Sequence, residues 1–375
     1  MFIEVEQKTL AKALHMISGA AAARSPIPIL AGLKLEADPG GLTLAAGHPG
    51  MMLQYRIPSG DGQAIVGQRG SIVVPARYLT ELIRRLPEGF VTVSCTEDRV
   101  VVIRSGGAAY RLSGMCADAF PALARLEHSA VVHMPNFALK RAIKQVAFAV
   151  STSDARPSLT GVSCRSEGGQ VRLTATDGVR LASRTIAASK RRQDAFPAVV
   201  IPGKPLSEFS KMMHDEQGTT AVTLGKDSIR FQTGDLLMQC SLLAGGFPSA
   251  DQLTPAAFAA ELTLETQALL RTLVRVSLLS GDSKTVRLTV LSESAIELSS
   301  RTAAVGDAAE TVGIEALSGE KLAVSFNGSH MTDIIEAVDS ACVTLKLAGK
   351  WSPIVIRPAD CPSSFYILTP IRTRG

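Results

Sequence analysis

One helical pattern occurs three times in the chain: residues 10–17 read LAKALHMI, residues 139–146 read LKRAIKQV, and residues 269–276 read LLRTLVRV. In each stretch, apolar residues at the first, fifth and eighth positions fall on one face of a helix. The three stretches begin 129 and 130 residues apart. A constant period of this kind indicates that one structural unit is repeated along the sequence.

Further elements recur at matching distances after each helix. A short apolar strand follows it, then a second helix, then strands in which apolar and polar residues alternate. The first strands lie at 42–44, 171–173 and 296–298, the second helices begin within 74–79, 201–206 and 326–331, and the later strands include 91–93, 222–224 and 343–345. The sequence therefore predicts an α+β fold made of three similar units.

With 375 residues, the chain is too long for one core and fits three units of about 125 residues. We expect an N-terminal domain over 1–125, a middle domain over 126–253 and a C-terminal domain over 254–375, with boundaries beside proline-containing segments. An alternative is that folded α+β domains look alike by chance. The agreement of several elements in register argues against it.

The composition excludes several classes of protein. Hydrophobic residues make up 46% and charged residues 19%, which is unlike a disordered chain. No stretch approaches the roughly 18 apolar residues that cross a bilayer, and the acidic start differs from a signal peptide. The six cysteines show neither C-x-x-C nor zinc-ligand spacing. We therefore expect a cytoplasmic protein with no membrane partner, no metal and no cofactor.

Basic residues stand opposite the apolar stripe of each first helix. Lys12, Arg141 and Arg271 each follow the leading leucine by two positions and have another basic residue about one turn away. Like charges at this spacing weaken an isolated helix, so a polyanionic partner is one explanation and a solvated helix face is the other. The net charges of the three expected domains are +3, +4 and −2. Any DNA contact should therefore rest on the first two.

Signatures of catalysis are missing from the sequence. It contains no Gly-rich phosphate loop ending in G-K-[ST], no H-E-x-x-H and no G-x-S-x-G. Asp177 is the acid that most invites a catalytic role, but Asp-Gly after a strand is ordinarily a turn. We expect no catalytic residues.

The segment around Asp177 nevertheless identifies a family. Residues 175–182 read ATDGVRLA, and further matches include RSPIPIL at 24–30, VPAR at 74–77, Phe247-Pro248 and YILTPIR at 366–372. In this ordered combination the chain resembles the bacterial DNA polymerase III beta subunits, the sliding clamps. The resemblance extends over all three repeats.

The resemblance implies a ring of two chains and six domains, with helices lining a hole for duplex DNA and sheets outside. Such a ring is a non-catalytic processivity factor for the polymerase. The repeat agrees with this, because three units whose sheets continue one another leave an open edge at each end. A twofold rotation that joins the first unit of one chain to the third of its mate closes both edges.

The resemblance also implies partners and site residues. Duplex DNA would be held without regard to sequence by Arg24, Lys12, Arg77, Arg141, Lys144 and Lys204, and the dimer joint would contain Tyr110, Leu278 and Leu279. The polymerase III alpha subunit, the clamp loader and other proteins would insert a short segment with Gln and a Leu-x-Phe-like apolar pair into a groove. Its residues would be Leu159, Thr176, Gly178, Val179, Arg180, Leu181, Pro248, Gln252, Leu253, Pro353, Ile367, Leu368, Thr369 and Pro370.

The chain departs from the family pattern at 47–52 and at three groove positions, where Val179, Gln252 and Thr369 replace a frequent His, Arg and Met. These departures suggest a divergent or second-copy clamp. Two alternatives stay open: a DNA-binding or scaffold protein of the same fold that forms no ring, and an enzyme whose site the sequence hides.

Overall fold

The computed structural model describes residues 1–21, 27–48, 50–60, 63–124, 126, 130–188, 196–214 and 216–372. It contains two compact units. The first comprises Met1–Asn136 with Met212–Leu242, and the second comprises Phe137–Lys211 with Leu243–Gly375. Each unit combines part of the expected middle domain with one neighbouring domain.

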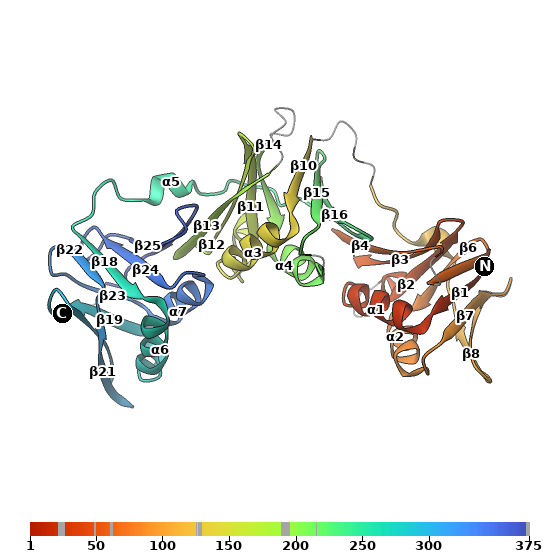
Figure 1. The fold of residues 1–375 in the computed structure, drawn as a ribbon, viewed down its shortest axis with the longest axis horizontal. Coiled ribbons are helices and arrows are strands. Elements are labelled where there is room, and N and C mark those ends of the chain that lie inside the picture. The colour runs from red at the N-terminus through yellow and green to blue at the C-terminus, as the bar shows by residue number, and fades with distance from the viewer. Residues whose placement is uncertain are drawn as a thin grey trace. The chain divides into compact units, whose positions relative to one another are not determined.

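The first unit contains helices α1 and α2, which lie side by side in Figure 1. Its helices and strands are α1 (Gln7–Ser18), α2 (Ala76–Arg85), β1 (Phe2–Glu6), β2 (Gly32–Asp38), β3 (Gly41–His48), β4 (Met51–Pro58), β5 (Ala64–Gln68), β6 (Gly70–Pro75), β7 (Phe90–Cys95), β8 (Val100–Ser105), β9 (Ala108–Ser113), β10 (Ala130–Pro135), β15 (Thr219–Leu224), β16 (Ser228–Thr233) and β17 (Leu236–Ser241). They form a five-stranded sheet, β5-β1-β7-β8-β9, and an eight-stranded sheet, β10-β15-β16-β17-β4-β3-β2-β6.

The second unit contains the remaining helices, of which α6 and α7 pack against each other (Figure 1). Its helices and strands are α3 (Asn136–Ala147), α4 (Gly203–Met212), α5 (Ala250–Leu253), α6 (Thr266–Ser277), α7 (Gly328–Ala337), β11 (Gly161–Glu167), β12 (Gln170–Thr176), β13 (Arg180–Ala187), β14 (Phe196–Pro202), β18 (Ala260–Glu265), β19 (Thr285–Val290), β20 (Ala295–Thr302), β21 (Gly306–Gly313), β22 (Ala316–Gly319), β23 (Ala323–Asn327), β24 (Cys342–Leu347), β25 (Ile354–Pro358) and β26 (Ser364–Leu368). A nine-stranded sheet has the order β14-β11-β12-β13-β26-β25-β24-β18-β22, and a four-stranded sheet the order β21-β20-β19-β23.

The predicted helical repeat is confirmed. The first helices of the three repeats, α1, α3 and α6, have twelve residues each, and the second helices, α2, α4 and α7, have ten each. The apolar stripes that defined the pattern are buried: Leu10, Leu14 and Ile17, then Leu139, Ile143 and Val146, then Leu269, Leu273 and Val276. Burial of these stripes against the sheets is what stabilises helices of this length.

Both long sheets cross the expected domain boundaries. Strand β17 of the expected middle domain pairs with β4 of the N-terminal domain, and β13 of the middle domain pairs with β26 of the C-terminal domain. The sheets of neighbouring repeats therefore continue one another. The boundaries at 125 and 253 themselves stay predictions.

Strands β9 and β21 each form one edge of a sheet. Strand β9 is the last strand of the five-stranded sheet, and β21 is the last strand of the four-stranded sheet. Five of the six residues of β9 are exposed, as are five of the eight in β21. An exposed strand edge offers its backbone N–H and C=O groups to another strand.

Candidate functional site

The floor expected for the candidate groove is an apolar cluster on β13, β26 and β25. Leu181 stands opposite Ile367, which stands opposite Val355, and all three side chains are buried. Ala250 of α5 packs on them, together with the half-buried Phe258 and Phe365. Expected middle and C-terminal domains thus contribute to one continuous buried apolar cluster. The groove that the resemblance implies would lie over this cluster, and we call it the partner groove.

Exposed side chains border this floor where the strands end. Val179 is 43% exposed just before β13, and the backbone N–H of Thr369 donates to its carbonyl oxygen over 2.9 Å. Leu253 of α5 is 42% exposed, and Gln252 beside it is also exposed. The predicted groove residues Thr176, Gly178, Pro248, Pro353 and Pro370 also lie at strand ends or in the segments next to them. Exposed apolar side chains beside an apolar floor suit a peptide with apolar anchors.

The turn that carries Val179 is fixed by short polar contacts. Oδ1 of Asp177 accepts hydrogen bonds from the backbone N–H groups of Val179 and Arg180, both at 2.9 Å. Gly178 has a φ of +93°, a conformation that favours glycine. Asp177 therefore shapes a turn, as its Asp-Gly sequence indicates, and this turn holds Val179 out toward solvent.

Arg180 joins this turn to the C-terminal repeat. Its Nε lies 3.0 Å from Oδ2 of Asp177, its Nη1 pairs with Asp333 of α7, and its Nη2 donates to the carbonyl of Phe148 over 3.0 Å. The guanidinium also stands 5.3 Å from the centroid of the Phe148 ring. Burial, and then the nearby Arg180 cation, lower the pKa of His330 on the same helix as Asp333. This cluster ties strand β13 to α7 beneath the groove.

Three predicted groove residues are largely buried. Successive side chains of a strand point to opposite faces, so Leu368 and Arg180, which stand opposite each other, face away from Ile367 and Leu181. Leu368 is fully buried on that face beside Tyr366, whose hydroxyl donates to the carbonyl of Ala337 in α7. Leu159, at 6% exposure, is buried in the short helical turn Pro157–Thr160 before β11.

The candidate DNA contacts are mostly exposed cations on helices. Lys12, Arg77, Lys144 and Lys204 are exposed on α1, α2, α3 and α4 in turn. Arg141 differs, because its Nε lies 2.7 Å from Oδ2 of Asp339 and its side chain is only 31% exposed. Arg24 lies outside the described residues.

The residues expected at a dimer joint lie beside the two sheet edges. Tyr110 is in β9 and is 38% exposed. Leu278 follows α6, which contacts β21, and at 76% it is strongly exposed for a leucine, while Leu279 is half-buried. Arg275 of α6 also reaches β21, where its Nη2 lies 2.6 Å from Oε2 of Glu310.

Several residues of the groove were missed by sequence reasoning. Val355, Phe365 and Ala250 complete its floor, and Asp333 and Phe148 hold Arg180. Phe365 could have been found, because it is two positions before Ile367 on the same strand face. The partners of Arg180 could not, since Phe148, which follows α3, and Asp333 of α7 meet it only through the tertiary fold.

The described residues contain no cluster of His, Cys, Asp and Glu arranged to hold a metal ion. The six cysteines are all free thiols. Within the same part of the chain, none of the helices combines the length and the apolar character that crossing a bilayer requires.

Replacing Arg180 by Gln should destabilise the second unit. The substitution leaves Asp177, with a side chain only 18% exposed, without its cation, and loss of one partner from a buried ion pair costs about 3 kcal/mol. Arg165→Gln in the same repeat is the matched control, since its pair with Glu167 is exposed and should contribute about 1 kcal/mol or less. Urea unfolding followed by circular dichroism measures both. If the free energy of unfolding falls equally in the two variants, the Arg180 cluster has no special structural role.

Comparison with known proteins gives one family for the whole chain. Residues 1–124, 133–249 and 251–372 match the N-terminal, central and C-terminal domain models of the DNA polymerase III beta subunit. The chain is 34% identical to the beta sliding clamp of Halalkalibacterium halodurans and 31% identical to that of Bacillus subtilis, each over the full length of both chains.

Solved structures agree with these matches. The crystal structure of the Bacillus subtilis DNA polymerase sliding clamp has a TM-score of 0.95 at 30% identity and covers 100% of this chain and 99% of its own. The beta subunit from the DNA polymerase of Streptococcus pyogenes has a TM-score of 0.94 at 28% identity, with full coverage of both chains. The chain therefore belongs to the DNA polymerase III beta subunits, the bacterial sliding clamps that serve replication as non-catalytic processivity factors.

Proposed function

We propose that two copies of this chain close into a ring around duplex DNA and that the partner groove tethers the replicative polymerase to it. Topology holds the DNA in this arrangement, so the protein needs no tight contact with any base. The polymerase III alpha subunit and the clamp loader would each present a short segment to the groove, and the work would take place on the bacterial chromosome in the cytoplasm.

Two edge strands with mostly exposed residues, β9 and β21, support the proposal of a ring. Strand β9 ends a sheet in the N-terminal repeat, and β21 ends a sheet in the C-terminal repeat. In a twofold dimer, β9 of one copy can pair with β21 of the other, and the rotation forms this joint twice. The exposed Tyr110 and Leu278 lie beside these edges and would be covered by the pairing.

Exposed cations on the helices suit DNA that must slide. Lys12, Arg77, Lys144 and Lys204 carry long side chains that reach phosphates without reading bases. Such contacts are screened by salt and are individually weak, with each neutralised phosphate steepening the salt dependence of binding. Weak contacts that are equivalent along the duplex allow movement of the ring without dissociation.

The partner groove suits a peptide with two apolar anchors. Its floor of Leu181, Val355 and Ile367 is buried and apolar, while Val179 and Leu253 are exposed beside it. In peptide recognition, apolar pockets take the side chains of a linear motif, and backbone groups at their edge fix its orientation.

Retention on DNA of different topology tests the ring. We expect clamps loaded on a nicked circular plasmid by the clamp loader to co-elute with it in gel filtration, and to be lost by more than about tenfold once a restriction enzyme linearises the plasmid. Blocking both ends of the linear DNA with bound protein should restore retention. Equal retention on open linear and circular DNA would indicate a DNA-binding protein that forms no ring.

A further inference from the structure

The half-buried His330 lies in the first turn of helix α7. Its backbone N–H donates to Oδ1 of Asn327 over 3.2 Å, which fixes the residue at the start of the helix. Its ring nitrogen Nδ1 is buried and makes no hydrogen bond. The N-terminal end of a helix carries partial positive charge, so this position disfavours a second positive charge on the imidazole.

Charged groups from three parts of the fold face this imidazole. Arg180 begins strand β13, Asp177 lies in the turn before it, Asp333 follows on α7, and Lys284 precedes strand β19. Burial, and then the Arg180 cation, lower the pKa of His330 from its ordinary value of 6.5, and Lys284 acts in the same direction, against the two carboxylates. These two cations balance the two anions. Protonation of the imidazole would add a third cation.

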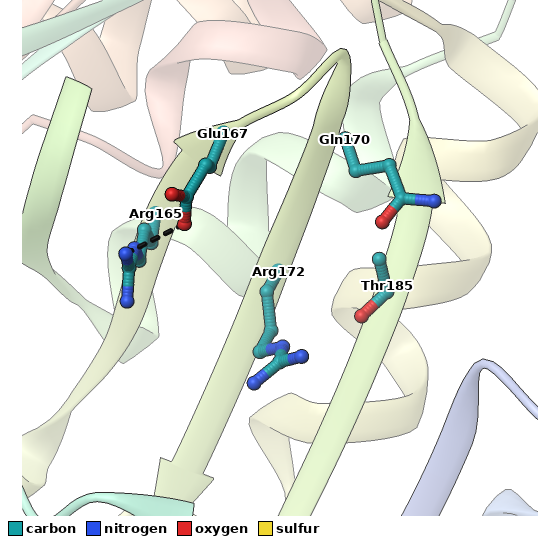
Figure 2. Close-up of a pocket in the computed structure, with 5 residues that line it drawn as sticks. All are labelled: Arg165, Glu167, Gln170, Arg172 and Thr185. Atoms are coloured by element: carbon teal, nitrogen blue, oxygen red, sulfur yellow. Dashed lines mark ion pairs between the residues drawn. The ribbon is translucent and has the colours of Figure 1, made fainter. Parts of the chain in front are cut away.

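This cluster lies on the face of β13 that is turned toward α7, where Arg180 pairs with Asp333. Successive side chains of a strand alternate between its faces, so Thr185 stands on the opposite face of β13, beside the exposed pair of Arg165 and Glu167 (Figure 2). Water screens the Arg180 side chain much less than that pair, because it is only 11% exposed. An added charge therefore has a larger effect on this cluster.

The end of the chain connects this cluster to the partner groove. The N–H of Thr369 donates to the carbonyl of Val179, and the N–H of Ile371 donates to the carbonyl of Ser325, in the strand that leads into α7. The N–H of Val179 in turn donates to Asp177, whose other carboxylate oxygen pairs with the guanidinium of the cluster. A change of charge in the cluster can therefore reach the border of the groove.

We propose that His330 is a proton-sensitive residue that lowers the affinity of the partner groove for its peptide in acid. The proposal rests on the proposed function of the partner groove. Residues three positions apart on a helix are neighbours, so a protonated His330 can pair with Asp333 and compete with Arg180 for this carboxylate. Arg180 then loses a partner, and the turn that holds Val179 loses part of its support.

Fluorescence anisotropy with the full chain at a series of pH values tests this proposal. The labelled peptide carries Gln and a Leu-x-Phe pair, has blocked ends and contains no His, Asp or Glu. From about pH 8 down to about pH 5, we expect the dissociation constant of the parent to rise at least about threefold, because only the neutral form of His330 supports the groove. His330→Gln cannot take up the proton, so its dissociation constant should stay constant over this range. His330→Arg carries a permanent cation and should bind weakly at every pH.

His214 supplies the matched control, since it is an exposed histidine of the first unit. His214→Gln should keep the pH dependence of the parent. Urea unfolding gives a second measurement. Because the folded chain lowers the pKa of His330, the folded state takes up this proton less readily than the unfolded state. As the pH falls below 6.5, the free energy of unfolding should therefore fall less in His330→Gln than in the parent.

The outcomes separate the role of His330 from the groove itself. If the peptide binds but the parent shows no pH dependence, or if His330→Gln weakens in acid as the parent does, the role of His330 is wrong and the groove stands. If the peptide binds at no pH, both proposals are overturned.

Discussion

Replacing Leu278 by Asp should raise the dissociation constant of the dimer by at least about 100-fold. Burial of a leucine contributes about 1.5–3 kcal/mol, and the twofold axis would place Leu278 in both joints of the ring. The substitution removes that burial twice and adds a carboxylate that must lose water. Sedimentation velocity over a range of concentrations measures the shift from dimer to monomer, and retention on circular plasmid should fall with it.

The exposure of Leu278 makes this result interpretable. Since 76% of its side chain is exposed in the single chain, the variant should fold with an unchanged melting profile at concentrations where both proteins are monomeric. Phe137→Asp is the matched control, because Phe137 is 54% exposed on α3 in the middle repeat, which contains neither β9 nor β21. If Leu278→Asp dimerises with the same affinity as the parent, the dimer joint lies elsewhere on the chain.

Periodicity in the sequence predicts the helices because each buries a stripe that the pattern defines. Leu139, Ile143 and Val146 are all buried, as their spacing requires. The turn at Asp177 could also be predicted, because its carboxylate accepts hydrogen bonds from N–H groups only two and three residues away. Local interactions of this kind can be read from neighbouring residues.

Contacts across the fold could not be predicted in the same way. Asp333 is 153 residues from Arg180, and the sequence shows it only as an acid on a helix where the other repeats have bases. The opposite orientations of Ile367 and Leu368 follow from strand alternation, but only after the strand and its register are known.

Removal of residues 369–375 should weaken binding of a Gln and Leu-x-Phe peptide by about 30-fold or more. The removed segment contains Thr369 and Pro370 from the border of the groove. Loss of an apolar contact together with a backbone hydrogen-bond donor costs about 2 kcal/mol of binding free energy. Strand β26 ends at Leu368, so its pairing with β13 and β25 stays intact. Fluorescence anisotropy measures the peptide affinity, and sedimentation should show an unchanged dimer.

The tail is docked by two backbone contacts, which explains why so short a segment can matter. The N–H of Thr369 donates to the carbonyl of Val179, and that of Ile371 donates to the carbonyl of Ser325 over 2.7 Å. Removal of residues 373–375 alone keeps both contacts and should leave the affinity unchanged. Thr369→Arg keeps the backbone and places a bulky cation beside the apolar floor, so it should reproduce the loss without shortening the chain. If the truncated chain and Thr369→Arg both bind the peptide as tightly as the parent, the partner segment docks outside the groove over Leu181 and Ile367. If both variants lose affinity, the peptide binds at this border of the sheet.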